Sequence, residues 1–262
     1  MSRRFTLEEP PSRLAIWSLR LTVLALVLAF GAVVLVRSFS HDVLGWITFV
    51  AALALAVAGI VSALSAFVVI WNDGNPGLRR AVLALPLGAA LLAWPAIIAV
   101  QSRDLPLLAD VSTDTADPPQ FEAIARERSE EARPLAPPSA EATQKQRVAY
   151  PDLVPLLLAN APAEVYASAL EAANRNRWRV VEARAPQPGR ADGRIEAVAR
   201  TPLMGFREDV IVRVRASGRG ARVDIRSASR FGPHDFGSNA RRIRALRAEL
   251  ADEFELQPAA TR

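Results

Sequence analysis

Hydrophobic residues are concentrated in the first hundred positions of the chain, where they form three long apolar stretches. A helix that crosses a bilayer needs about 20 predominantly apolar residues, and each stretch reaches that length. The pattern therefore predicts an α-helical transmembrane bundle over residues 1–100. Its three spans are expected at residues 14–36, 43–71 and 78–100.

Arginines are distributed unequally around these spans, and the asymmetry predicts an orientation. Basic residues are enriched on the cytoplasmic side of membrane proteins. Six arginines flank the chain start and the second loop, whereas Arg37 and Arg103 lie on the opposite side. We therefore expect a multi-pass protein of the bacterial inner membrane, with a cytoplasmic N-terminus and a periplasmic C-terminal domain. The six arginines are Arg3, Arg4, Arg13, Arg20, Arg79 and Arg80.

The second predicted span carries small residues at helical spacing, at Gly59 and Ala63 and again at Ala58, Ser62 and Ala66. Small residues let helices approach closely, so this face could also support an oligomer. No ionisable residue lies deep within any span, which favours a packed anchor over a polar pathway. An accessory subunit of a membrane transport complex is the alternative, and it would require other membrane chains.

The residues after position 100 are mostly polar, and the spacing of their apolar residues differs from one segment to the next. Residues 101–151 form a proline-rich segment expected to be extended, with a short polar helix at 121–133. Residues 152–262 are expected to form a periplasmic α+β domain. Apolar residues alternate with a period of two in four predicted strands, at residues 178–183, 194–201, 208–216 and 221–229, and helices are predicted at 160–176 and 236–254.

Short turns between these strands predict a four-stranded antiparallel meander with both helices packed on its apolar face. The opposite face is expected to be a solvated ladder of charges. It carries Arg213, Arg215, Arg222, Asp224 and Arg226.

Composition removes several kinds of chemistry. The chain has no cysteine and two histidines, His41 and His234, so we expect no disulfide, thiolate or histidine-based metal site and no cofactor. The net charge of +5 comes from arginines interleaved with acids, which argues against nucleic acid. Asp110, Asp114 and Asp117 lack the spacing of a calcium loop, and we expect them to form turn hydrogen bonds instead.

Several ordered motifs carry a resemblance to a known family. They are Asp114-Thr-x-Asp-Pro-Pro-x-Phe121, Tyr150-Pro151, Ile195-Glu-Ala197, Gly205-Phe-Arg-Glu-Asp-Val210, Val223-Asp-Ile-Arg-Ser-Ala-Ser-Arg230 and Asp235-Phe-Gly-Ser-Asn-Ala-Arg-Arg-Ile243. Over about residues 105–250 the chain resembles the bacterial family called domain of unknown function 1499. Some members similarly have an N-terminal membrane anchor. The resemblance implies no activity, substrate, cofactor or catalytic residue.

The densest polar cluster lies where the last predicted strand leads into the last predicted helix. A helix N-terminus beside hydroxyls and arginines suits an anion or a partner. The alternative is a structural network in which Asp235 caps the helix and Arg226 or Arg230 pairs with Asp209 or Asp224. The candidate binding residues are Arg226, Ser227, Ser229, Arg230, Ser238, Asn239 and Arg242.

A hydrolase is the competing interpretation of the same cluster. Ser227 or Ser229 with His234 and Asp235 would supply the residue types of a catalytic triad. Adjacent histidine and aspartate rarely adopt that geometry, and no nucleophile elbow surrounds either serine. We therefore expect a non-catalytic membrane protein that binds a membrane lipid headgroup, a small anion or an envelope protein.

Overall fold

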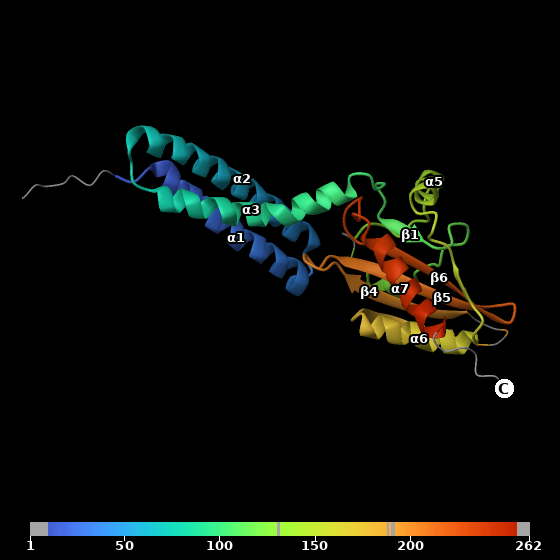
Figure 1. Cartoon of the computed structure of the whole chain (residues 1–262). Helices are drawn as coiled ribbons and strands as arrows, with labels where there is room; N and C mark the ends of the chain where they lie inside the picture. The colour runs from blue at the N-terminus through green and yellow to red at the C-terminus, as the bar shows by residue number, and fades with distance from the viewer. Residues whose placement is uncertain (1–9, 130–131, 188, 190–191, 256–262) are drawn as a thin grey trace, which may run out of the picture. The chain divides into compact units, whose positions relative to one another are not determined.

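The computed structural model describes residues 10–129, 132–187, 189 and 192–255. The chain divides into two compact units, Met1–Gln101 and Ser102–Arg262. The first is helical, and the second combines helices with one sheet (Figure 1).

The N-terminal unit consists of three helices, α1 (Arg13–Phe39), α2 (Asp42–Asp73) and α3 (Leu78–Ser102). All three are long and apolar enough to cross a membrane, which confirms the three apolar helices predicted from hydropathy. Ser40 and Gly74 end α1 and α2 in the left-handed conformation, a common way to terminate a helix. Arg3 and Arg4, two of the six arginines behind the predicted orientation, lie outside the described residues.

Small residues of α2 allow α1 to pack closely against it. A side chain at Gly59 would collide with Thr22 Oγ1 and would lie 3.2 Å from the Ser18 carbonyl oxygen. Ala63 and Ala66 belong to a buried alanine cluster that includes residues of all three helices. The Gly59 and Ala63 face is therefore used for packing within the chain, whereas Ala58 is exposed.

The C-terminal unit contains one antiparallel sheet of six strands rather than the predicted four. The four predicted strands form the expected meander, with β3–β4, β4–β5 and β5–β6 paired in sequence. Both additional strands, β1 and β2, pair with the free edge of β6. Each has only three residues, too few to produce a recognisable alternation. The strands are β1 (Asp110–Ser112), β2 (Leu156–Leu158), β3 (Arg179–Arg184), β4 (Gly193–Arg200), β5 (Arg207–Ser217) and β6 (Gly220–Ser229).

Both long helices of this unit, α6 (Pro162–Arg175) and α7 (Ser238–Glu255), pack on the same face of the sheet, as predicted (Figure 1). Alternate residues of β4, β5 and β6 meet the apolar stripes of the helices in one continuous core. Burial of these apolar side chains is the main favourable term in folding. The fully buried members of this core include Ile195, Val212, Val214, Val223, Ile225, Ile243, Leu246 and Leu250.

The opposite face of the sheet is covered as well, so the expectation of a solvated charge ladder is wrong. Asp224 and Arg226 are completely buried. Residues 112–129, including the short helix α4 (Ala123–Glu127), cross this face, and Phe121 and Ile124 belong to a second small apolar cluster there. The polar sequence of this segment predicts irregular structure, but the folded segment covers the charged side chains on this face of the sheet.

The segment from residue 101 to 151 also contains a helix that the sequence pattern did not indicate, α5 (Ala140–Ala149). Ser139 caps its start by accepting a hydrogen bond from the Ala142 N–H (3.1 Å). Gln146 of α5 bonds the backbone of Ser112 twice, through Oε1 (3.1 Å) and Nε2 (2.6 Å). The helix thereby fixes β1 against β6.

Candidate functional site: polar clusters on the two faces of β6

The strand β6 separates the predicted binding residues into two groups. Successive side chains of a strand point to opposite faces. Ser227 and Ser229 point to the helical face, whereas Arg226 and Arg230 lie on the covered outer face. The structure therefore does not bring these seven residues together around one ligand. It instead distributes them between a polar network on the helical face and separate networks on the outer face.

The network on the helical face is centred on Glu208, which was not among the candidate residues predicted from the sequence. Its Oε1 accepts hydrogen bonds from Ser229 Oγ (3.0 Å) and from Ser238 Oγ, and its Oε2 accepts from Arg242 Nη2. Arg242 Nη1 also donates to Ser227 Oγ (3.1 Å). A glutamate on the apolar side of β5 was the one sequence signal for this network.

Asn239 and Asp235 complete the network at the start of α7. Asn239 Oδ1 accepts from Ser227 Oγ (2.7 Å), and its Nδ2 donates to Ser229 Oγ (3.0 Å). The Asp235 carboxylate accepts the backbone N–H groups of Gly237 (2.8 Å) and Asn239 (3.0 Å), as a helix cap does. Burial raises the pKa of Asp235, although these two hydrogen bonds favour its charged form.

No catalytic triad is assembled among the described residues. The hydroxyls of Ser227 and Ser229 donate to Asn239 and Glu208 rather than to a histidine. The His234 ring packs against Phe236, with ring centroids 4.6 Å apart. A nucleophile needs its base within hydrogen-bond reach, and that condition is not met here.

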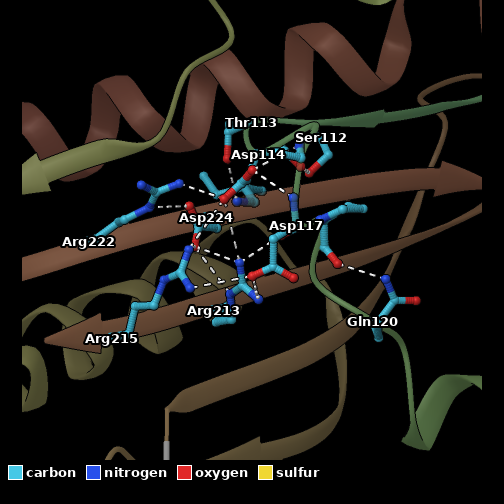
Figure 2. A network of polar contacts seen from close by, with 12 residues as sticks. Ser112, Thr113, Asp114, Asp117, Gln120, Arg213, Arg215, Arg222 and Asp224 are labelled. Atoms are coloured by element: carbon cyan, nitrogen blue, oxygen red, sulfur yellow. Dashed lines mark hydrogen bonds and ion pairs between the residues drawn. The ribbon is translucent and has the colours of Figure 1, made fainter. Parts of the chain in front are cut away.

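Three aspartates and three arginines form the largest outer-face network (Figure 2). Asp224 is central, since Arg222 Nε (2.9 Å), Arg213 Nη2 (3.0 Å) and Arg215 Nη2 (2.9 Å) all reach its carboxylate. Asp114 lies above it and binds Arg222 Nη2 (2.6 Å). Asp117 is mostly exposed and contacts Arg213 Nη1 (2.9 Å). The charges are therefore balanced within this network.

Asp114 also forms the predicted turn. Its Oδ1 accepts the N–H groups of Ala116 (3.0 Å) and Asp117 (2.9 Å). Burial alone would raise the pKa of Asp114, but these two hydrogen bonds together with Arg222 and Arg213 outweigh it and lower that pKa. Within the described residues, no group of acidic or histidine side chains could hold a metal ion.

The second outer-face network is built on Arg226, whose side chain is 0% exposed. It binds Asp110 with two parallel hydrogen bonds, from Nε (2.9 Å) and Nη2 (2.7 Å). Nη1 donates to the Pro119 carbonyl (3.0 Å), and the guanidinium lies over the Phe121 ring at 5.2 Å. Arg226 therefore ties the covering segment to the sheet.

The third network surrounds Asp209 of β5, which is completely buried. Arg230 binds it through Nε (2.8 Å) and Nη2 (2.6 Å), and Arg128 Nε lies 3.3 Å from its second oxygen. Arg230 thus pairs with Asp209, one of the two partners considered for it. Burial raises the pKa of Asp209 despite these arginines, and burial also lowers the pKa of Arg128.

A separate groove of about 370 Å³ lies between the start of the C-terminal unit and α5. Its lining combines cationic and apolar side chains, of which Val148 is 73% exposed. None of these residues was among the candidates predicted from the sequence. They are Arg103, Asp104, Leu105, Pro106, Gln144, Lys145, Val148 and Ala149.

The fold and these networks define a class of protein: an α+β domain with a covered antiparallel sheet, preceded by three helices apolar enough to span a membrane. The family model described as "Protein of unknown function (DUF1499)" matches residues 110–250, and the chain belongs to this family. This confirms the resemblance seen in the sequence. No curated protein and no solved structure matches the chain.

Proposed function

We propose that this chain is a non-catalytic protein of the bacterial inner membrane whose C-terminal domain faces the periplasm and binds the headgroups of anionic lipids beside its own anchor. The groove next to α5 is the observation that carries the proposal. It places Arg103 and Lys145 next to Leu105 and Val148. Such a lining suits a lipid, which presents a charged headgroup and an apolar chain together.

Covalent connection puts one wall of this groove directly after α3 in the chain. Arg103 is the residue after the last residue of α3, Ser102, and a chain advances at most about 3.6 Å per residue. With α3 in the bilayer, one wall of the groove remains within reach of the headgroups. A basic side chain near an anionic membrane surface contributes about 1 kcal/mol of binding free energy.

The two cations of the groove are available to such a ligand. Arg103 pairs with Asp104 (3.1 Å) and Lys145 with Glu141 (2.6 Å), and all four side chains are at least half exposed to solvent. Ion pairs at the surface are worth little, about 0–1 kcal/mol. A lipid phosphate can therefore replace these carboxylates at low cost.

Binding fits the polar networks better than hydrolysis does. The hydroxyls of Ser227 and Ser229 are buried and hydrogen bonded within the fold. A hydrolase would need one of them beside His234, with room for a substrate.

Lipids that co-purify with the full-length protein in detergent test the proposed ligand. We expect anionic lipids to be enriched over their share of the membrane, and Arg103→Gln/Lys145→Gln to lose most of that enrichment. Arg177→Gln/Arg219→Gln is the matched control, because both arginines are exposed and lie outside the groove. Equal lipid composition for both double variants would refute the proposal.

Orientation requires a separate test. A reporter enzyme that is active only in the periplasm, fused to the C-terminus, is expected to be active in intact cells. Activity of a cytoplasm-specific reporter at the same position would refute the proposed topology, whatever the lipid result.

A further inference from the structure

Arg128 is a buried arginine whose donors are not used by the part of the chain that the structure describes. Its side chain is only 7% exposed, yet Nε, Nη1 and Nη2 all lack a hydrogen-bond acceptor among the described residues. The nearest carboxylate oxygen is Asp209 Oδ2, 3.3 Å from Nε, and it forms an ion pair with Arg128 without a hydrogen bond. Arg230 contacts the other oxygen, Oδ1, through Nε (2.8 Å) and Nη2 (2.6 Å), so no carboxylate among the described residues reaches Nη1 or Nη2 of Arg128. A buried guanidinium without acceptors is costly unless a further anion binds it.

Several arginines lie close to Arg128 in the described part of the chain. The backbone N–H of Arg133 donates to the Arg230 carbonyl (2.8 Å), and the N–H of Arg230 donates to the Arg207 carbonyl (3.1 Å). These bonds place three further arginines at neighbouring backbone positions. Arg128, Arg207 and Arg230 act electrostatically on Asp209, and Arg133 acts on Arg128.

The other acids near Arg128 that the structure describes have partners of their own. Asp110 acts on Arg128 electrostatically, but its two oxygens are bonded to the fully buried Arg226. Glu127, one residue before Arg128, pairs with Arg179 (2.9 Å). The exposed Ser129 and Arg133 leave the network a route to solvent.

We propose that Arg128, together with Arg230 and the rim residue Arg133, forms a binding site for a phosphate group on the outer face of the sheet. The planar guanidinium presents paired N–H donors that match two oxygens of a phosphate. Asp209 holds Arg230 and keeps one side of Arg128 in place. This site is distinct from the lipid groove, and none of the groove's lining residues belongs to it.

Binding of inorganic phosphate to the full-length protein in detergent, measured by calorimetry at constant ionic strength with chloride as the competing anion, tests the site. We expect saturable binding with one site per chain. Arg128→Gln should weaken it at least tenfold, because a charge-assisted pair of donors is lost. Arg128→Lys keeps the charge and removes the fork of donors, so an intermediate loss is expected. Arg126→Gln, an exposed arginine two residues earlier, is the matched control and should bind like the wild type.

Two further experiments identify the source of the phosphate and test whether another group occupies the site. If the protein binds phosphatidic acid in nanodiscs but not inorganic phosphate, and this binding depends on Arg128, the site takes a lipid-borne phosphate. Glu130 and Glu131 follow closely in the sequence, outside the described residues. Phosphate binding that appears only in Glu130→Gln/Glu131→Gln would show that the chain's own carboxylates fill the site, and would overturn the proposal. Equal binding by Arg128→Gln and the wild type would overturn it as well. Neither result depends on Arg103 or Lys145, so the lipid groove stands or falls separately.

Discussion

Replacing Arg226 by methionine tests whether one buried arginine holds the covering segment on the sheet. Methionine keeps much of the apolar volume and removes the guanidinium. The change leaves the Asp110 carboxylate without its two hydrogen bonds and the Pro119 carbonyl without its donor. It also removes the contact between the guanidinium and the Phe121 ring.

The expected loss follows from these contacts. Removing one partner of a buried ion pair costs about 3–5 kcal/mol, because the other charge is left uncompensated. Asp110 is 14% exposed and can recover some hydration, so we expect a loss near the lower limit, about 3 kcal/mol. With a urea slope of about 2 kcal/mol/M, the unfolding midpoint should fall by roughly 1.5 M.

The assay uses residues 102–262 as an isolated domain, with unfolding followed by Trp178 fluorescence and circular dichroism. This unit has its own hydrophobic core, and Trp178 packs against that core. Arg219→Met is the control, since Arg219 is exposed in the β5–β6 turn, and its midpoint should stay within about 0.3 M of the wild type. Asp110→Asn with Arg226→Met should recover part of the loss. A shift below about 0.5 M for Arg226→Met would refute the reasoning, because it would mean that Asp110 is solvated without Arg226.

Three further substitutions probe other parts of the molecule. Gly59→Val should lower the thermal midpoint of the full-length protein in detergent, because its side chain meets Thr22 in the α1–α2 interface and overpacking costs about 1–3 kcal/mol. Glu208→Gln should destabilise the isolated domain by about 3 kcal/mol in urea, since it leaves the guanidinium of Arg242 without its carboxylate. Asp114→Asn should reduce the acid sensitivity of the domain. The pKa of Asp114 is lowered in the folded state, so its stabilisation is present above its unfolded pKa of about 3.9 and is lost as the pH falls through the folded pKa. The wild type should therefore lose more stability between pH 7 and pH 3 than this variant does.

Each of these predictions has a control in the same part of the chain. Ala58→Val is the membrane control, because Ala58 is exposed on α2 and should tolerate the added methyl groups. Glu164→Gln on α6 is the control for Glu208, since Glu164 is exposed. Asp117→Asn is the control for the acid titration. A pH profile of Asp114→Asn that overlays the wild-type profile would show that Asp114 does not contribute in this way.

The fold was largely readable from periodicity. Long apolar stretches predicted the three helices of the N-terminal unit, and alternation predicted β3 to β6 in the right order. The strands β1 and β2 were missed because three residues carry no period. Their positions depend on hydrogen bonds from β6 and from Gln146, which are long-range interactions that a local pattern does not contain.

The candidate site was only partly readable, for a geometric reason. The predicted cluster treated residues 226–230 as one surface, but alternation along β6 sends Ser227 and Arg226 to opposite faces. Burial of Arg226 was hidden because arginines on the polar side of a strand ordinarily face water. The sequence did not indicate a role for Arg128, because its contact with Asp209 forms only when the covering segment folds over the sheet.

The late position of β6 in the chain has a consequence for biosynthesis. β6 is the partner strand of β1, β2 and β5, and 116 residues separate Asp110 from the arginine that neutralises it. At a synthesis rate of about 5–20 residues per second, the first covering residues wait on the order of ten seconds for this strand. During that interval β1 lacks its partner strand and the Asp110 carboxylate lacks its arginine, so a chaperone could shield both. A ribosome that stalls before β6 therefore leaves an anchored chain whose sheet lacks the strand that joins its early and late parts.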